Sequence, residues 1–226
     1  MKQAYRVVLC LCVFSINQGQ VYGRYRPSKP IGQGVEALVR VYYDNGYVLS
    51  EQTIKKLIEK NITKHFEQNI TKHFEKIFLQ IQEKLHNDKI MVNLTVQHVQ
   101  KNDNLTVFIK QNETVNGNAT LEALKGLLLQ PPHLPNNTIG YHFTGYNINE
   151  TRPDALYTNN TFCTEQPTAT VLQSLQFTNF YLSAWKMTLF ILGSNHTPVP
   201  DKEDYKRMND SFWRCSHEAG KATKIS

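Results

Sequence analysis

Apolar and polar positions alternate along Val35–Tyr43, and this segment is rich in β-branched and aromatic residues. The pattern predicts a β-strand, which the turn sequence Asp44-Asn45-Gly46 closes. After Ser50, a residue that can cap a helix, apolar residues recur every three or four positions as far as Leu85. This second pattern predicts one amphipathic helix of about 35 residues.

The rest of the chain predicts further strands and helices with no long linker between them. Two strands, a short helix, a strand and an apolar helix follow in the order Ile90–Val96, Asn104–Ile109, Ala119–Gln130, Thr138–Gly145 and Phe177–Leu192. Gly193 then serves as a left-handed cap. The order of these elements predicts a single α/β (α+β) domain built on one mixed sheet.

The first 23 residues have the layout of a secretory signal peptide. A basic start with Lys2 and Arg6 precedes an apolar stretch, and small residues offer cleavage after Gly19 or Gly23. The alternative is a buried N-terminal strand. With a signal peptide at 1–23, a lead at 24–34, a domain at 35–216 and a tail at 217–226, the mature chain keeps two cysteines. In an oxidising compartment we expect Cys163 and Cys215 to form one disulfide.

Sequons for N-glycosylation occur from one end of the chain to the other and also favour secretion. None has proline in the middle position, and their density far exceeds chance. The predicted glycosylation sites are Asn61, Asn69, Asn93, Asn104, Asn112, Asn118, Asn136, Asn149, Asn159, Asn195 and Asn209. A secreted, heavily glycosylated protein is therefore expected.

Charge and hydropathy exclude two classes of partner. The formal net charge is +6, and removal of Lys2 and Arg6 with the signal would leave about +4, spread widely, which does not favour nucleic acid. No apolar run approaches 18 residues, so no membrane span is expected. A repeated heptapeptide at 61–67 and 69–75 contains His65 and His73, which we interpret as part of a solvent-facing duplication rather than as metal ligands.

The second apolar helix and its exit carry the residues of a recognisable motif. Leu192-Gly193-Ser194 is followed by His196, three residues after the glycine. The stretch resembles H-E-x-x-H-x-x-G-x-x-H-D of the metzincin zinc endopeptidases, especially the reprolysin or ADAM-like branch. In that family the three histidines of the motif bind zinc, and the glutamate acts as base on the zinc-bound water.

The resemblance preserves the spacing of the motif but not its chemistry. Gly193 and His196 match the turn glycine and the third histidine. Lys186, Met187 and Phe190 stand in place of the first histidine, the glutamate and the second histidine. The resemblance thus implies a metzincin-like fold over 35–216, with a mostly parallel sheet and long helices, that has lost both zinc and proteolytic activity.

Other parts of the chain extend the resemblance. The family places bridged cysteines where Cys163 and Cys215 occur, and Tyr205–Met208 resembles its methionine turn, with Met208 as the candidate residue. We expect Trp185 either to pack in the core or to cover the former cleft, and the ammonium of Lys186 to reach solvent.

The nearest resemblance is to the secreted salivary metzincins of ticks. It implies a monomeric, non-catalytic glycoprotein that binds host haemostatic, matrix or immune proteins. The alternatives are an active secreted zinc endopeptidase, and an unrelated secreted glycoprotein or small-molecule carrier.

Overall fold

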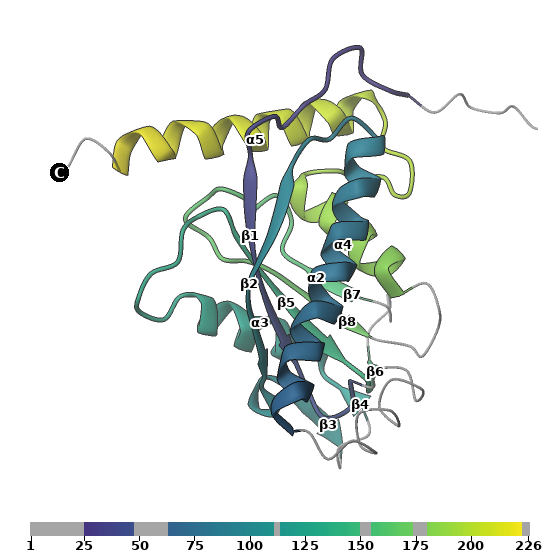
Figure 1. Cartoon of the computed structure of the whole chain (residues 1–226), viewed down its shortest axis with the longest axis vertical. Coiled ribbons are helices and arrows are strands. Elements are labelled where there is room, and N and C mark those ends of the chain that lie inside the picture. Colours follow the sequence, from purple (N-terminus) through teal and green to yellow (C-terminus); the bar gives the residue numbers. More distant parts are fainter. Residues whose placement is uncertain (1–24, 48–62, 111–113, 150–154, 174–179, 223–226) are drawn as a thin grey trace, which may run out of the picture.

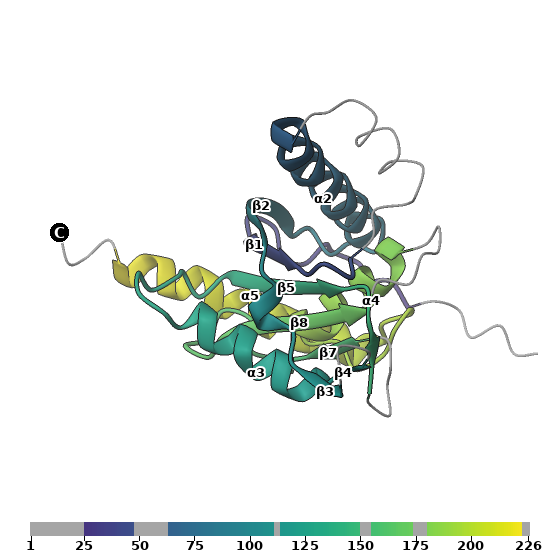
Figure 2. The same cartoon turned by 90° about the horizontal axis from the view of Figure 1, so that it is seen from below.

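A computed structural model describes residues 25–47, 63–110, 114–149, 155–173 and 180–222. These residues form a five-stranded sheet in the order β2-β1-β5-β8-β7, with helices on both faces (Figures 1 and 2). Among the helices that the structure describes, none combines the length and apolar character needed to cross a membrane.

The central strands of the sheet follow the predicted alternation. β1 (Glu36–Tyr43) lies between β2 (Asn93–Lys101) and β5 (Thr138–Thr144), and both neighbours are parallel to it. β8 (Thr168–Gln173) continues the parallel set, and β7 (Ala155–Tyr157) closes the edge as the antiparallel strand. The predicted mixed, mostly parallel sheet is therefore confirmed.

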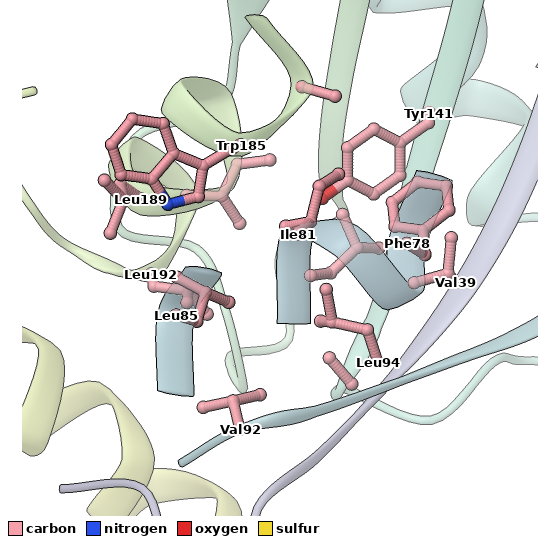
Figure 3. Close-up of a cluster of buried hydrophobic side chains, with 14 of the residues drawn as sticks. Val39, Phe78, Ile81, Leu85, Val92, Leu94, Tyr141, Trp185, Leu189 and Leu192 are labelled. Atoms are coloured by element: carbon pink, nitrogen blue, oxygen red, sulfur yellow. The ribbon is translucent and has the colours of Figure 1, made fainter. Parts of the chain in front are cut away.

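One face of the sheet is covered by α2 (Thr63–Asn87) and α4 (Phe180–Leu192). Every second residue of β1 and β5, including Val39 and Tyr141, points to this face and meets apolar side chains of the two helices. Figure 3 shows the centre of this core, where Phe78 and Tyr141 lie edge to face with their ring centroids 4.7 Å apart. This core positions α4, the helix that carries the motif.

The opposite face is covered by α3 (Gly117–Leu128), which begins at Asn116, whose side chain accepts a hydrogen bond from the Ala119 N–H. A second, small sheet lies beside this layer and consists of β3 (Phe108–Lys110), β4 (Thr114–Val115) and β6 (Asn147–Ile148). The expectation of one sheet was therefore incomplete.

A last helix, α5 (Lys202–Ala222), crosses one end of the sheet and joins the core through Tyr205, Met208 and Phe212 (Figure 1). Its Cys215 forms a disulfide with Cys163 in the loop between β7 and β8, with a Cα–Cα distance of 5.0 Å. The predicted disulfide is confirmed, and it links α5 to the loop between β7 and β8.

Two sequence predictions need correction, and a third is only partly covered by the structure. The strand predicted over Asn104–Ile109 begins instead as a 3₁₀ turn, η1 (Asp103–Leu105), because Asn102 caps it through a hydrogen bond from the Asn104 N–H. The tail predicted at 217–226 belongs to α5 as far as Ala222, so a boundary at 216 would cut a helix. The parts of the two predicted long helices at 50–62 and 177–179 lie outside the described residues.

Candidate functional site

The exit of α4 is shaped by a glycine. The Gly193 N–H donates to the Phe190 carbonyl (3.1 Å), and the Ser194 N–H donates to the Leu189 carbonyl (2.9 Å). These two bonds form a Schellman motif, which requires the left-handed φ of 116° that Gly193 adopts. The predicted left-handed cap is confirmed, and it turns the chain toward His196.

The motif positions on α4 lie along its less buried side, although Met187 still packs against the core. Lys186 is exposed, Met187 is half-buried, and Phe190 lies one turn beyond Lys186 on the same side of the helix. The Phe190 ring stacks on Tyr157 of the edge strand β7, with centroids 4.8 Å apart and an interplanar angle of 7°. An aromatic pair thus fills the position of the family's second histidine.

Trp185, next to the motif face, belongs to the core. It is buried among the α2 and α4 side chains (Figure 3). The Lys84 ammonium lies 4.4 Å from the centre of the Trp185 ring. Trp185 was expected either to pack in the core or to cover the former cleft, and packing in the core is observed.

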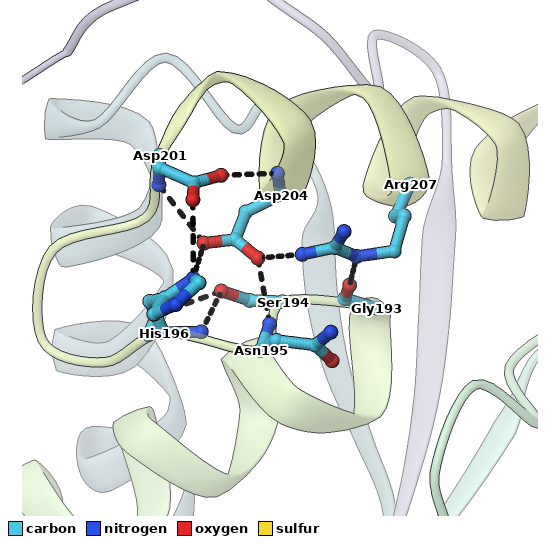
Figure 4. Close-up of polar contacts among 7 residues, drawn as sticks. All are labelled: Gly193, Ser194, Asn195, His196, Asp201, Asp204 and Arg207. Carbon is cyan, nitrogen blue, oxygen red and sulfur yellow. Dashed lines mark hydrogen bonds and ion pairs between the residues drawn. The ribbon is translucent and has the colours of Figure 1, made fainter.

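His196 lies beside the first turn of α5. Its Nδ1 is 3.0 Å from Oδ2 of Asp204 and 3.2 Å from Oδ2 of Asp201 (Figure 4). The imidazole itself is 61% exposed, whereas the Asp204 carboxylate is fully buried. The third histidine of the motif is therefore held by carboxylates.

Asp201 and Asp204 form a capping box at the start of α5. Oδ1 of Asp201 accepts from the Asp204 N–H (2.8 Å), and Oδ2 of Asp204 accepts from the Asp201 N–H (2.9 Å). Oδ1 of Asp204 also accepts from the Asn195 N–H (2.7 Å) and from Arg207 (Figure 4). Burial by itself raises the pKa of Asp204, but these donors outweigh it and hold the pKa below the ordinary value.

We tested whether this group fits a metal ion. His196, Asp201 and Asp204 offer three ligand atoms within 4.8 Å of one another, the one such group in the described ranges. Both Asp204 oxygens already accept two hydrogen bonds, and the hydrogen that joins His196 to Asp204 occupies Nδ1. The two carboxylates therefore fit a helix cap, and His196 alone remains of the three histidines that the resemblance requires for zinc.

The methionine turn is not observed. Asp201 and Asp204 start a helix that runs through Tyr205–Met208, so this segment forms no turn. Met208 is fully buried within α5. This part of the motif prediction is wrong.

A second histidine–aspartate pair lies at the carboxyl ends of β1 and β5. Thr106 Oγ1 donates to Asp44 Oδ2 (2.8 Å) and lies 2.9 Å from His142 Nε2. Because a hydroxyl has one hydrogen, Nε2 of His142 must be the donor in the second bond. Burial lowers the pKa of His142 to about 4, although Asp44 and Asp103 act in the opposite direction.

This buried pair was not predicted from the sequence. Nδ1 of His142 has no hydrogen-bond partner among the residues that the structure describes. Asp44 also accepts from the backbone N–H groups of Tyr47 (3.0 Å) and Gly145 (3.4 Å). A Cβ at Gly145 would lie 1.4 Å from the Gly46 carbonyl oxygen, so this close approach requires glycine.

The histidine repeat on α2 differs from its prediction. His73 is half-buried, and its Nε2 lies 3.0 Å from the Tyr47 hydroxyl. Burial, together with Lys76, lowers the pKa of His73. The solvent-facing interpretation is therefore wrong for His73, and the side chain of His65 lies outside the described part of the chain.

The predicted glycosylation sites lie on the surface wherever the structure gives their exposure. The exposed sequon asparagines are Asn93, Asn104, Asn118, Asn136, Asn149, Asn159, Asn195 and Asn209. Asn61 and Asn112 lie outside the described residues, as does the side chain of Asn69. Exposure is necessary for a glycan in the folded protein, and occupancy stays a prediction.

Comparisons with known proteins add one finding. No protein-family model matches the sequence, and no curated protein matches it. Among solved structures, metalloproteinase-II from Bacteroides fragilis is similar to this chain, with a TM-score of 0.45 and 11% sequence identity. The similarity covers 82% of this chain, and the chain spans 55% of the length of that protein.

The class that the structure defines is a mixed α/β domain with a mostly parallel sheet. The resemblance to metzincins rests on the sequence of the motif positions alone.

Proposed function

We propose that this chain is a secreted, N-glycosylated member of the metzincin type that has lost proteolysis and acts by binding extracellular host proteins. The resemblance to tick salivary metzincins points to haemostatic, matrix or immune targets. The exposed sequon asparagines support an extracellular location. We further propose that the protein is monomeric and contacts neither nucleic acid nor membrane.

The outward face of α4 is the observation that carries this proposal. At the positions of the two histidines and the base, it presents an exposed ammonium, a half-buried thioether and an aromatic ring stacked on Tyr157. A thioether cannot accept the proton of a zinc-bound water, and an ammonium repels the ion. These positions therefore lack the groups needed for hydrolysis by the family's mechanism.

Restoring the motif tests the family assignment. We expect the secreted wild type to hold about zero zinc per chain, and K186H/M187E/F190H to hold about one, because the third histidine is still present. Zinc would be measured by mass spectrometry after purification without chelator or metal resin. A cooperative thermal transition would show that each variant is folded.

The matched control adds His196→Ala to the triple variant. Loss of zinc in this quadruple variant would show that His196 is the third ligand of the restored site. Zinc in the wild type would contradict the loss of the metal, whereas a folded triple variant without zinc would contradict the metzincin alignment.

Binding is tested separately on the glycosylated wild type. We expect saturable binding to a purified plasma or matrix protein, measured by surface plasmon resonance, with no cleavage of that protein. Cleavage that a chelator stops would favour the active protease instead.

A further inference from the structure

A small cavity of about 180 Å³ lies where the chain enters β5 and β8. Its apolar wall includes Leu128, Leu134 and Pro167, and its polar rim includes His133, Glu165 and Gln166. The cavity is smaller than the roughly 300 to 1,000 Å³ usual for drug-sized ligands. Its size therefore suits a single ring with both apolar and polar faces.

Asn136, one of the predicted glycosylation sites, is itself part of the cavity wall. It is exposed, and its carbonyl oxygen accepts from the Cys163 N–H (3.0 Å), which fixes this loop to the disulfide-bonded loop before β8. A sugar attached to Asn136 would thus begin at the edge of the cavity, so its effective concentration there would be high.

Thr138, the hydroxyl residue of the same sequon, also lines the cavity. Asn136 lies in a turn that the Thr138 N–H closes by donating to the Pro135 carbonyl (2.9 Å), and both Asn136 and Thr138 contribute to the cavity wall. Thr138 is only 7% exposed, and its Oγ1 has no hydrogen-bond partner in the described part of the chain. A buried hydroxyl without a partner is unfavourable, so the site lacks a polar group that a ligand could supply.

We propose that the cavity is the docking site of the first N-acetylglucosamine of the Asn136 glycan. The inference rests on the proposed glycosylation and adds a structural role for one glycan. The C–H face of the sugar ring packs against Leu134 and Pro167, while its hydroxyl and acetamide groups meet the polar rim. The remaining sugars extend into solvent.

Nuclear magnetic resonance of the full chain provides the direct test. The protein is secreted from cells that make only high-mannose glycans and is trimmed with endoglycosidase H, which leaves one ¹³C-labelled N-acetylglucosamine at each occupied site. We expect nuclear Overhauser effects from the acetamide methyl of the Asn136 sugar to Leu128 or Leu134, and broader lines for this sugar than for the one at Asn209. Glycopeptide mass spectrometry establishes which sites are occupied.

Two variants separate docking from the mere presence of a glycan. Gln166→Trp keeps the sequon but fills the mouth of the cavity, so the Overhauser effects should disappear while Asn136 stays occupied. Asn136→Gln should lower the melting temperature by about 2 to 4 °C. The matched control Asn209→Gln removes a glycan from an exposed position of α5 and should change it by less than about 1 °C.

The outcomes are distinguishable from those of the proposed function. An occupied Asn136 whose sugar shows sharp lines and no Overhauser effects overturns the docking but leaves secretion and glycosylation standing. An unoccupied Asn136 overturns both the docking and the glycosylation of this site. Equal thermal shifts in the Asn136 and Asn209 variants also count against docking.

Discussion

Two histidine–aspartate pairs of this chain differ in almost every physical respect. His196 is 61% exposed and meets the buried Asp204 at the start of α5. His142 and Asp44 are both buried at the carboxyl ends of β1 and β5, with 3.8 Å between Nε2 and Oδ2. In the first pair the carboxylate is satisfied by four donors, whereas in the second the histidine keeps an unpartnered Nδ1 among the described residues.

The difference shows that the same two residue types can serve opposite purposes. At the α4–α5 corner the charge on Asp204 organises a helix start, and the histidine adds only one of its donors. At the carboxyl ends of β1 and β5 the histidine is kept neutral by burial, and its buried Nδ1 lacks a hydrogen-bond partner among the described residues. The first pair depends on its carboxylate, and the second depends on the protonation state of its ring.

The largest expected effect is the loss of the Asp204 carboxylate. Asp204→Ala leaves Arg207 and three other donors without their acceptor, so the free energy of unfolding should fall by about 4 kcal/mol in urea denaturation. The matched control Glu203→Ala changes an exposed neighbour and should stay within about 0.5 kcal/mol of wild type. Equal effects of the two variants would contradict the role of Asp204.

Acid should act on the two pairs in separate pH ranges. Because the folded pKa of His142 is about 4 and the ordinary value is 6.5, the unfolded chain binds more protons between these values. Stability should therefore fall by up to about 3 kcal/mol as the pH is lowered from 6.5 to 4. The lowered pKa of Asp204 acts below this range, since its contribution is lost only as the pH falls below the ordinary aspartate value of 3.8.

The histidine responsible can be identified by substitution. His142→Gln keeps a hydrogen-bond donor for Thr106 and removes the titration, so the slope of unfolding free energy against pH between 4 and 6.5 should become shallower. Urea titrations at five pH values measure this slope independently of any constant loss of stability in the variant. An unchanged slope would mean that another group titrates there.

The sequence predicted the strands that carry the buried pair but not the pair itself. Alternation identified β1 and β5, but Asp44 and His142 lie far apart in the chain and meet only because the strands are adjacent and parallel, with Tyr42 opposite His142. Periodicity cannot specify which strands are neighbours, so this pair was out of reach of the sequence.

The start of α5, by contrast, was readable and was missed. Asp201 followed three residues later by Asp204 is a helix-start signal, and Tyr205, Met208 and Phe212 recur at helical spacing. The resemblance to a methionine turn and the helical spacing predict different structures for this segment, and the helix is the one observed. A local signal with a clear physical cause was the better guide to this segment.

The smallest expected effect separates the two histidines most sharply. His196→Ala removes one donor from a carboxylate that keeps three, and the imidazole is largely in solvent. A surface pair of this kind contributes about 0 to 1 kcal/mol, so the variant should lose about 0.5 kcal/mol at pH 7 in urea denaturation. A loss above about 2 kcal/mol would show that His196 stabilises the fold more than an exposed ring can by itself. A metal ion or ligand bound at the α4–α5 corner would then have to be considered again.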